Sequence, residues 1–244
     1  MLQREGSPAQ EPGRPGGRLS PLDGYSGSLA NRTYVALREA ILNLSYRPGE
    51  ALRKGEICAA LGVSRSPVAE AITRLAGEGL VDVVPQAGTY VARFSMDEIR
   101  EGAFLREAIE LAAVERVAPA ITEDQLVQLR RNLRVQEALV ADGDYAGFYK
   151  LDGEMHEMIL AFTGFRRLGQ VADSAWVHVN RARQLVLPLR GRVAETLEEH
   201  RAILAALEAR DAQAARAAMR LHLGRLVTFL EPLEKSHPEL FEPG

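Results

Sequence analysis

One aspartate and three histidines are the residues whose types and spacing most directly suggest chemistry. Asp152 and His156 are four residues apart, so in a helix they share a face about one turn apart. His200 and His222 lie in two later segments with helical spacing and apolar neighbours. Joint coordination of a divalent ion with a carboxylate would satisfy the ring nitrogens in such a setting. For any one of these histidines alone, an ordinary hydrogen bond in the core or at the surface stays the simpler explanation.

A second group of polar residues marks the start of a predicted helix. Ser64 is a good N-cap, and Pro67 is tolerated in the first turn. Apolar residues then recur at helical spacing and predict a core-facing stripe: Val68, Ala71, Ile72 and Leu75. Arg65, Ser66 and Arg74 fall outside that stripe. The pattern predicts the second helix of a helix-turn-helix, which presents Arg and Ser near its start to DNA.

Two short β-rich runs follow this helix. Residues 81–84 and 89–92 are separated by a four-residue connection that contains Gly88. A helix-turn-helix followed by such a hairpin is a winged helix, and Gly88 is expected at the tip of the wing beside the DNA. The predicted DNA-binding residues are Ser64, Arg65, Ser66, Arg74 and Gly88.

The whole N-terminal segment resembles the DNA-binding domain of the GntR family of bacterial transcriptional regulators. The motifs that carry the resemblance are Arg47-Pro48-Gly49-Glu50, Leu61 to Val68, Glu78-Gly79-Leu80 and Gly88. One departure is Ala69, where the family usually has an arginine that often touches DNA. The resemblance implies binding to a double-stranded DNA operator in a bacterial cytoplasm. Because Ala69 replaces the usual arginine, the operator sequence or the affinity for it is expected to differ from that of other family members.

The rest of the chain shows a helical pattern without a convincing strand. Helices are expected near residues 97–117, 123–141, 144–162, 165–188, 192–209 and 212–233, separated by short breaks, with Ser95 or Asp97 and Asp211 as caps. Six such helices predict an antiparallel bundle and a mainly α fold. The expected organisation is a disordered tail over 1–28, a winged helix-turn-helix over 29–94, a helical metal- and effector-binding domain over 95–235, and a C-terminal tail over 236–244.

This helical half resembles the FCD domain, the ligand-binding domain of the FadR subfamily of GntR regulators. Four patterns carry the resemblance: Arg106 to Glu110 as R-x-x-x-E, Asp152 with His156 as D-x-x-x-H, Glu199 to Ile203 as EH-x-x-I, and Met219 to Leu223 as M-x-x-H-L. The chain departs from the family at Phe165, where the family often has asparagine. The resemblance turns the four candidate ligands, Asp152, His156, His200 and His222, into an expected metal site. One carboxylate and three imidazoles suit Zn(II), Ni(II) and other first-row ions.

The same resemblance implies a small organic-acid effector bound against the metal. Arg106 is the candidate carboxylate partner, since a guanidinium binds a carboxylate through two hydrogen bonds. The alternative is an intrahelical pair between Arg106 and Glu110 on a solvated face. Trp176, Asn180 and Arg183 share a helix face that would line the pocket. In the alternative, Trp176 lies in the core and Arg183 at the surface.

Composition is consistent with a DNA-binding regulator and argues against a membrane protein. The net charge is −3, but residues 29–94 carry 8 Lys/Arg against 6 Asp/Glu. No apolar run approaches the roughly 18 residues of a membrane span. We expect an effector-responsive homodimer that reads a pseudo-palindrome, because two-fold symmetry supplies the second half-site. Repressor is the assigned sign of regulation, and the sequence leaves an activator open. The alternative is a metallohydrolase with an attached DNA-binding domain, although position 160 is Leu, so HExxH is absent and no catalytic residue is assigned. A constitutive architectural DNA-binding protein would leave the helical half without a role.

Overall fold

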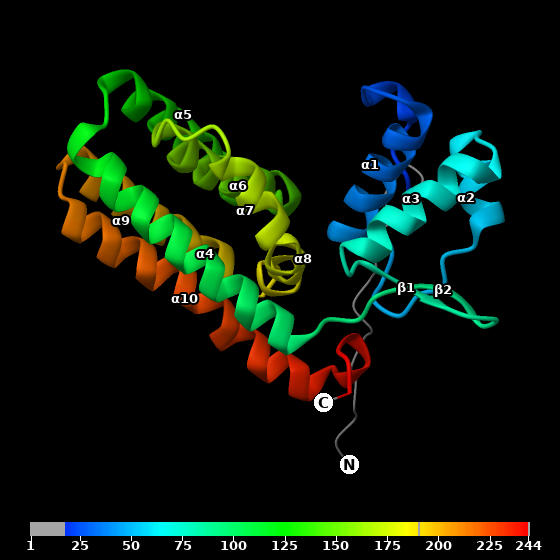
Figure 1. The fold of residues 1–244 in the computed structure, drawn as a ribbon. Helices are drawn as coiled ribbons and strands as arrows, with labels where there is room; N and C mark the ends of the chain where they lie inside the picture. The colour runs from blue at the N-terminus through cyan, green and yellow to red at the C-terminus, as the bar shows by residue number, and fades with distance from the viewer. Residues whose placement is uncertain (1–17, 190, 244) are drawn as a thin grey trace, which may run out of the picture.

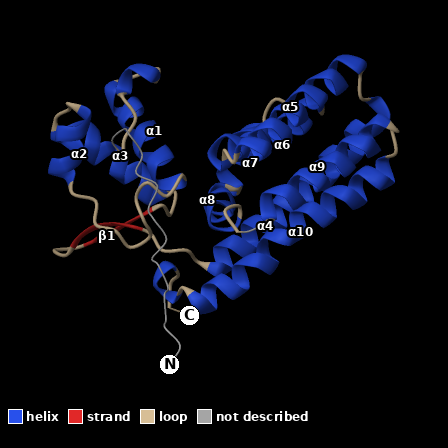
Figure 2. Cartoon of the chain, turned by 180° about the vertical axis from the view of Figure 1, so that it is seen from behind, coloured by secondary structure: helices blue, strands red, loops and turns tan. Residues whose placement is uncertain are grey.

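The computed structural model describes residues 18–189 and 191–243, which form two lobes (Figure 1). Within these residues, the N-terminal lobe holds three α-helices and a two-stranded hairpin, and the larger lobe is a bundle of helices (Figure 2). The C-terminal end of the chain returns to the segment that joins the lobes. This arrangement confirms the expected fold, a mainly helical protein with an N-terminal winged helix-turn-helix.

The N-terminal lobe is built around the helix-turn-helix pair. Helix α1 (Leu29–Leu42) precedes α2 (Lys54–Leu61) and α3 (Arg65–Gly77). Gly62 ends α2 at φ 66°, a left-handed conformation that a residue without a Cβ adopts at little cost, and turns the chain into α3. The apolar stripe of α3 is buried against the other helices of the lobe, as its spacing predicted.

The wing is an antiparallel hairpin of β1 (Val81–Val84) and β2 (Gly88–Val91). Val81 lies opposite Val91, and Val84 lies opposite Gly88. The backbone of β2 also bonds to the residues before α2, since the Leu52 amide donates to the Thr89 carbonyl at 2.8 Å. The outer side of β2 is therefore bonded to the segment that leads into α2.

The C-terminal lobe contains only helices in the part of the chain that the structure describes. They are α4 (Met96–Val117), α5 (Glu123–Asp142), α6 (Tyr145–Phe162), α7 (Leu168–Ala175), α8 (Val177–Val186), α9 (Arg192–Glu208) and α10 (Ala212–Ser236), with a short 3-10 turn η2 (Ala118–Ala120). Among the described residues no helix is both long and apolar enough to span a bilayer.

The helix expected over 165–188 is divided at Trp176, so the described bundle has seven α-helices where six were predicted. Trp176 has φ −105° and ψ 6°, outside the helical region. Its indole is buried in the core of the bundle, whereas the next residue, Val177, is buried in the core of the N-terminal lobe. The chain changes direction there because two neighbouring side chains are buried in different lobes.

Side-chain caps define where several helices begin. Ser95 accepts a hydrogen bond from the Glu98 amide at 3.3 Å, and Asp211 accepts one from the Ala214 amide at 2.9 Å. Both residues were expected caps. Thr122 and Gln125 form a reciprocal capping box at the start of α5. These caps fix the register of the helices that carry the candidate ligands and their neighbours.

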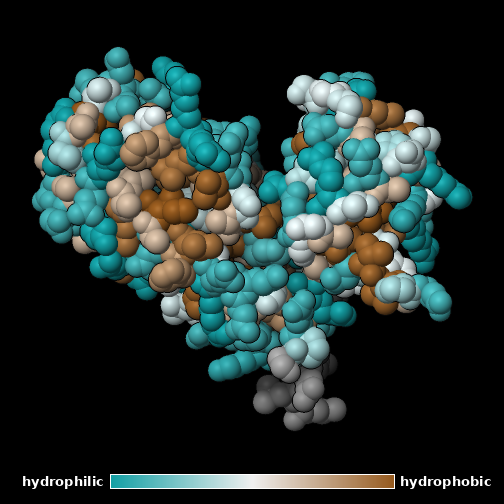
Figure 3. Space-filling model, in the orientation of Figure 1, coloured by the Kyte–Doolittle hydropathy of each residue, from teal (hydrophilic) through white to brown (hydrophobic). Residues whose placement is uncertain are grey.

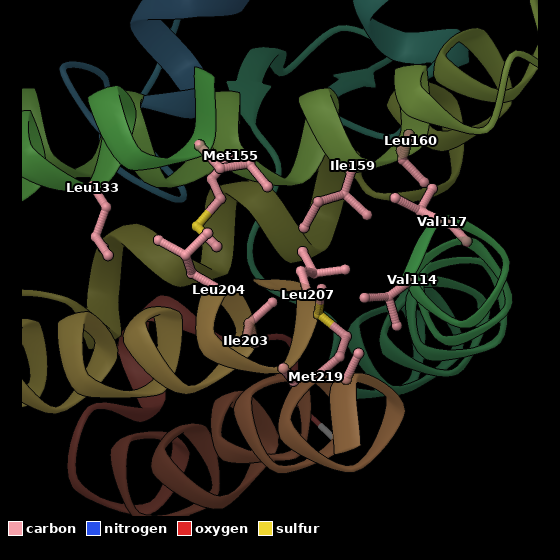
Figure 4. Packing of buried hydrophobic residues seen from close by; sticks show 14 of the residues in the cluster. Val114, Val117, Leu133, Met155, Ile159, Leu160, Ile203, Leu204, Leu207 and Met219 are labelled. Atoms are coloured by element: carbon pink, nitrogen blue, oxygen red, sulfur yellow. The ribbon is translucent and has the colours of Figure 1, made fainter. Parts of the chain in front are cut away.

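The bundle core holds α6, α9 and α10 together, and these helices carry the candidate metal ligands. Figure 4 shows apolar side chains from these helices and from α4 and α5 packed against one another. The labelled residues are Val114, Val117, Leu133, Met155, Ile159, Leu160, Ile203, Leu204, Leu207 and Met219. Met155 and Met219 lie one and three positions before His156 and His222 on the same helices. The core therefore places the histidines at a fixed depth inside the bundle.

Short elements and a few buried side chains lie in the described parts of both segments where tails were expected. Residues 18–28 include a 3-10 turn, η1 (Leu22–Gly24), in which Leu22 is 9% exposed. Residues 1–17 of the expected disordered tail lie outside the described residues. At the other end, η3 (Pro238–Leu240) precedes Phe241, which is buried against Phe94 with ring centroids 5.7 Å apart. The apolar side chain of Phe241 explains why this end is packed on the segment between the lobes.

Candidate metal centre and adjoining cavity

The structure brings the four predicted metal ligands together in the interior of the bundle. Asp152 and His156 come from α6, His200 from α9 and His222 from α10. One ligand atom from each side chain lies within 4.8 Å of the ligand atoms of the others, and all four residues are buried. The His156 and His222 Nε2 atoms are 3.1 Å apart, and His200 Nε2 is 3.3 Å from an Asp152 oxygen. Residues separated by up to 70 positions therefore converge on one point.

Each histidine has an acceptor at its other ring nitrogen. The Nδ1 atom of His200 donates to the Gln136 side-chain oxygen at 2.7 Å. The Nδ1 atom of His222 donates to the Glu199 carboxylate at 2.8 Å. In the same way, His156 Nδ1 contacts the Glu110 carboxylate. These acceptors keep the proton on Nδ1, so the lone pair of each Nε2 points toward the shared centre, as in metal-bound histidines.

The electrostatic environment keeps the imidazoles neutral. Burial is the main cause that lowers the pKa of His200 and His222 well below the ordinary value, and the neighbouring positive groups lower it further. Burial would raise the pKa of Glu199, but hydrogen bonds from His222 and Arg192 outweigh it and lower the value to about 2. Neutral imidazoles beside ionised carboxylates are the protonation states that bind a divalent cation.

The geometry and the unpartnered atoms of this cluster fit a metal ion. Both Asp152 oxygens and His200 Nε2 are buried without a hydrogen bond of acceptable geometry. Buried polar atoms normally have a partner, and a coordinated cation would supply it. A tetrahedral ion with ligands at 2.0–2.2 Å separates them by about 3.4 Å, close to the 3.1 and 3.3 Å contacts. The cluster could therefore hold a divalent cation, and its ligand types do not separate zinc from nickel.

A cavity of about 460 Å³ adjoins the cluster and is lined by all three predicted effector-binding residues. Arg106, Asn180 and Arg183 share this lining with His156 and Trp176. Arg106 donates to Glu110 at 2.6 Å, so the predicted intrahelical pair exists, but both side chains are buried rather than solvated. Arg183 is 8% exposed and Trp176 4%, so Arg183 is not the surface residue of the alternative interpretation.

Arg183 connects the cavity with the metal cluster. Its guanidinium contacts the Asp152 carboxylate and lies over the Tyr149 ring at 5.2 Å. Burial lowers the pKa of Arg183 to about 10, and the nearby Arg106 adds to this effect. The guanidinium is still charged at neutral pH, so the inner end of the cavity carries two buried cations beside the metal cluster. Such a site attracts a carboxylate.

The predicted DNA-binding residues divide into two sets. Ser64, Arg65 and Ser66 are exposed at the start of α3, and Gly88 is exposed at the wing with φ 142°. Arg74 is instead held against α1: it donates to the Asn31 side chain at 3.1 Å, and its guanidinium lies 3.6 Å from the centre of the Tyr34 ring. All five residues are exposed, and Arg74 differs from the first set in that its guanidinium also contacts α1.

Sequence reasoning missed the acceptors behind the histidines. Glu110 and Glu199 stood in the motifs that were noticed, but nothing in the sequence assigned them to His156 and His222. Gln136 carried no signal, because it lies 64 positions before its partner His200. The clearest hint that the sequence offered for these acceptors was a short run of polar residues that interrupts the otherwise apolar face of a helix.

The comparisons with known proteins cover both lobes. Residues 29–91 match the family described as "Bacterial regulatory proteins, gntR family", and residues 101–225 match the FCD domain. An HTH-type transcriptional regulator in an unstable DNA locus of Streptomyces ambofaciens is 35% identical over 85% of this chain and 87% of its own length. The HTH-type transcriptional repressor RspR of Escherichia coli K12 is 31% identical over 85% of this chain and 91% of its own length.

Solved structures share the fold. The E. coli protein McbR/YncC superposes with a TM-score of 0.74 at 22% identity, covering 85% of this chain and 99% of that one. A GntR regulator from Rhodococcus sp. RHA1 gives a TM-score of 0.73 at 26% identity, covering 83% of this chain and 97% of that one. Both lobes therefore match one known architecture over nearly its whole length.

Proposed function

Because this chain belongs to the GntR family of bacterial transcriptional regulators and carries an FCD domain, we propose that a small carboxylate controls its binding to operator DNA. The carboxylate binds in the 460 Å³ cavity beside a divalent ion, zinc or nickel, held by the Asp152 and histidine cluster. Members of this family are DNA-binding regulators and not enzymes, so the metallohydrolase alternative falls away. The regulator would act in the bacterial cytoplasm, where its operator is.

The observation that carries this proposal is the position of α8, which contacts both lobes. One face of α8 lines the cavity through Asn180 and Arg183, and Trp176 directly before it does the same. Val177, the first residue of the same helix, is buried in the core of the DNA-binding lobe. A single helix of ten residues thus separates the effector cavity from the winged helix.

Two polar contacts add to this connection. His178 lies 3.1 Å from the Glu78 carbonyl at the end of α3, the recognition helix. Arg181 is fully buried and donates to the Ala92 carbonyl at 2.7 Å, just after the wing. Two residues of α8 therefore contact the backbone of the DNA-binding lobe, one at the end of the recognition helix and one just after the wing. A shift of α8 would be transmitted to both the recognition helix and the wing.

The proposed coupling follows from these contacts. A carboxylate bound to Arg183 would share its guanidinium with Asp152, and it would draw the guanidinium toward the cavity and away from the Asp152 carboxylate. This displacement of the guanidinium would move α8 and favour one orientation of the DNA-binding lobe over another. The effector changes DNA affinity only by the difference in its own affinity for the two orientations.

We further propose a homodimer that binds a pseudo-palindromic operator. A single recognition helix contacts too few bases for specificity, and two-fold symmetry supplies the second half-site. Figure 3 shows apolar side chains gathered on the bundle around α4, where Phe104 is 72% exposed. An apolar surface of this kind on a soluble domain is typical of an interface between protein chains. The relative RspR is named a repressor, and we extend that sign of regulation to this chain.

The test begins with duplexes selected from a random-sequence pool by the purified protein. Binding to the selected duplex is then measured by fluorescence anisotropy with acetate, citrate or benzoate, each with and without Zn(II). We expect at least one carboxylate to change the Kd for DNA about fivefold or more in a metal-dependent way. A Kd that stays constant for every carboxylate, with metal loaded, contradicts effector control.

Two variants make this test specific to the site. Double replacement of His200 and His222 by Ala should remove stoichiometric metal from the purified protein. Arg106→Ala should keep metal and DNA binding but lose the carboxylate response, because the inner end of the cavity loses one of its two cations. A full response in Arg106→Ala would remove this residue from the effector site.

A further inference from the structure

The residues that line the cavity beside the Asp152 and histidine cluster differ in charge and polarity from one part of the cavity to another. These differences indicate which kind of molecule binds there. Its inner end is cationic and dry. Arg106, Arg183 and His156 line this end, and each is at most 8% exposed. Arg106 is paired with Glu110 and Arg183 with Asp152, so a divalent ion in the Asp152 and histidine cluster would supply the positive charge that is not yet balanced. A ligand carboxylate beside that ion would accept hydrogen bonds from both guanidinium groups.

The middle of the cavity is apolar. Leu160, Ala172 and Trp176 are buried in its wall, and each is at most 4% exposed. Two helical glycines, Gly153 and Gly169, also line it, and a Cβ placed on either would have no heavy atom within 4 Å. The Arg106 guanidinium lies 5.4 Å from the centre of the Trp176 ring, so this apolar wall begins directly beside the arginines. Leu160 and Ala172 have no polar side-chain atoms, so a polar group placed against them would lose its water without gaining a partner.

The charged groups that line the mouth of the cavity are two acids and one arginine, and a second arginine, Arg116, lies 4.6 Å from the centre of the Phe165 ring there. Glu157, Arg166 and Asp173 line the cavity and are exposed, so two carboxylates oppose one guanidinium. Phe165, 55% exposed, adds an aromatic ring at the same opening. A second carboxylate on the ligand would lie near these two acids and be repelled by them.

We propose that the effector of this chain is a monocarboxylate with an apolar body of ring size or larger, rather than a short hydroxy acid or a dicarboxylate. This inference rests on the proposed function, since it assigns the chemistry of the effector in the same cavity. The carboxylate binds Arg106 and Arg183 beside the metal, and the apolar body lies against Leu160, Ala172 and Trp176. A volume of about 460 Å³ lies in the range of cavities that enclose whole organic ligands, and acetate would leave most of it empty.

The experiment compares three probes by titration calorimetry on the full-length protein loaded with Zn(II). Acetate carries the carboxylate alone, benzoate adds an apolar ring, and terephthalate adds a second carboxylate at the far side of that ring. Burial of the ring should make benzoate bind about tenfold more tightly than acetate or better. Terephthalate should bind about tenfold more weakly than benzoate, because its outer carboxylate meets Glu157 and Asp173.

A cavity-filling variant tests whether the preference for benzoate over acetate depends on this cavity. Gly169→Leu places a side chain in the open part of the cavity without backbone strain, since Gly169 is helical. The ratio of the acetate Kd to the benzoate Kd should fall from about ten toward one. Gly55→Leu is the matched control: Gly55 is an exposed helical glycine of α2 with nothing within 4 Å of an added Cβ. The control should keep the wild-type ratio.

The outcomes separate this inference from the proposed function. Equal affinity for acetate and benzoate, or an unchanged ratio in Gly169→Leu, would overturn the apolar body while leaving a carboxylate effector in place. Terephthalate binding as tightly as benzoate would overturn the restriction to one carboxylate. If none of the three probes binds the metal-loaded protein, the proposed carboxylate control of DNA binding fails together with the inference.

Discussion

At the scale of single residues, each candidate histidine ligand owes its orientation to one acceptor on a neighbouring helix. Glu110 of α4, Gln136 of α5 and Glu199 of α9 lie behind the three rings. Without these acceptors an imidazole could rotate or place its proton on Nε2, and the lone pair would no longer face the centre. The two Nε2 atoms 3.1 Å apart, both acceptors, would repel one another unless a cation lies between them.

The role of Glu199 leads to a prediction about metal affinity. Glu199→Gln should weaken zinc binding about 10-fold or more, because the amide is a poorer acceptor for His222 Nδ1–H and makes the imidazole less basic. Competition with a chromogenic chelator measures this change. Glu198→Gln is the control, since Glu198 pairs with Arg201 on the exposed face of the same helix. Equal zinc affinities for the two variants would contradict the role of Glu199.

The DNA surface leads to a second prediction at this scale. Arg65→Ala should weaken operator binding at least about fivefold, since an exposed cation at the start of α3 is lost. Arg74→Ala should change operator binding less and instead lower the free energy of unfolding by about 1 kcal/mol, because it removes the Tyr34 and Asn31 contacts. Anisotropy and urea denaturation measure the two quantities. A loss of DNA affinity in Arg74→Ala as large as that in Arg65→Ala would place Arg74 on the DNA surface.

At the scale of elements, α8 is the helix on which the two lobes depend. Its length is short because Trp176 and Val177, adjacent in the chain, are buried in different cores. Arg181 is buried on this helix with Nε and one terminal nitrogen lacking a partner. Burial lowers its pKa to about 10, which still leaves it charged at neutral pH. A buried cation that is only partly satisfied adds little stability, so its role is better explained by positioning the wing.

A variant of Arg181 distinguishes an effect on the stability of the protein from an effect on the coupling between carboxylate binding and DNA binding. Arg181→Met should keep the melting temperature within a few degrees, since the thioether fills similar space and removes a poorly satisfied charge. The carboxylate-induced change in DNA affinity should fall below about twofold, because the bond to the Ala92 carbonyl is lost. Carboxylate binding itself should persist in calorimetry. Arg131→Met, at an exposed position of α5, controls for the loss of an arginine and should respond like wild type.

At the scale of the whole molecule, the cluster of Asp152, His156, His200 and His222 brings helices of the bundle together at its centre. Its four ligands come from α6, α9 and α10, and the acceptors behind them add α4 and α5. The junction between the lobes has a third apolar cluster, in which Phe94, Val186 and Phe241 bring together the linker, α8 and the C-terminal segment. A change at the cluster can therefore reach the junction through contiguous packed elements.

Metal removal should lower the stability of the whole protein. A ligand at about 100 times its Kd stabilises the native state by about 2.7 kcal/mol, which corresponds to about 5–10 °C in Tm for a chain of this size. A thermal melt of protein with Zn(II), repeated after chelation, measures the shift. The variant in which Ala replaces His200 and His222 should melt at the same temperature with and without chelator. A chelation-induced shift of equal size in that variant would place the metal elsewhere.

The sequence by itself determined the order of the elements and the identity of the candidate ligands. Helical spacing, caps at Ser95 and Asp211 and the glycine turn at Gly62 are local properties, since each depends on residues within a few positions. The four ligands were assigned correctly to helices because each lies on a helix with a strong apolar period. The division at Trp176 could not be predicted, because the local pattern is that of one continuous helix.

Only the tertiary structure decided which partners those residues meet. Gln136 and His200 are 64 positions apart, and Arg181 and Ala92 are 89 positions apart, so no sequence period relates them. The assignment of Arg74 to DNA, made from its place outside the apolar stripe, stays a prediction, and the sequence did not reveal that its guanidinium contacts the Tyr34 ring of α1. Contacts of this kind arise from how the helices pack against one another, and that packing depends on the shapes of all the buried side chains together.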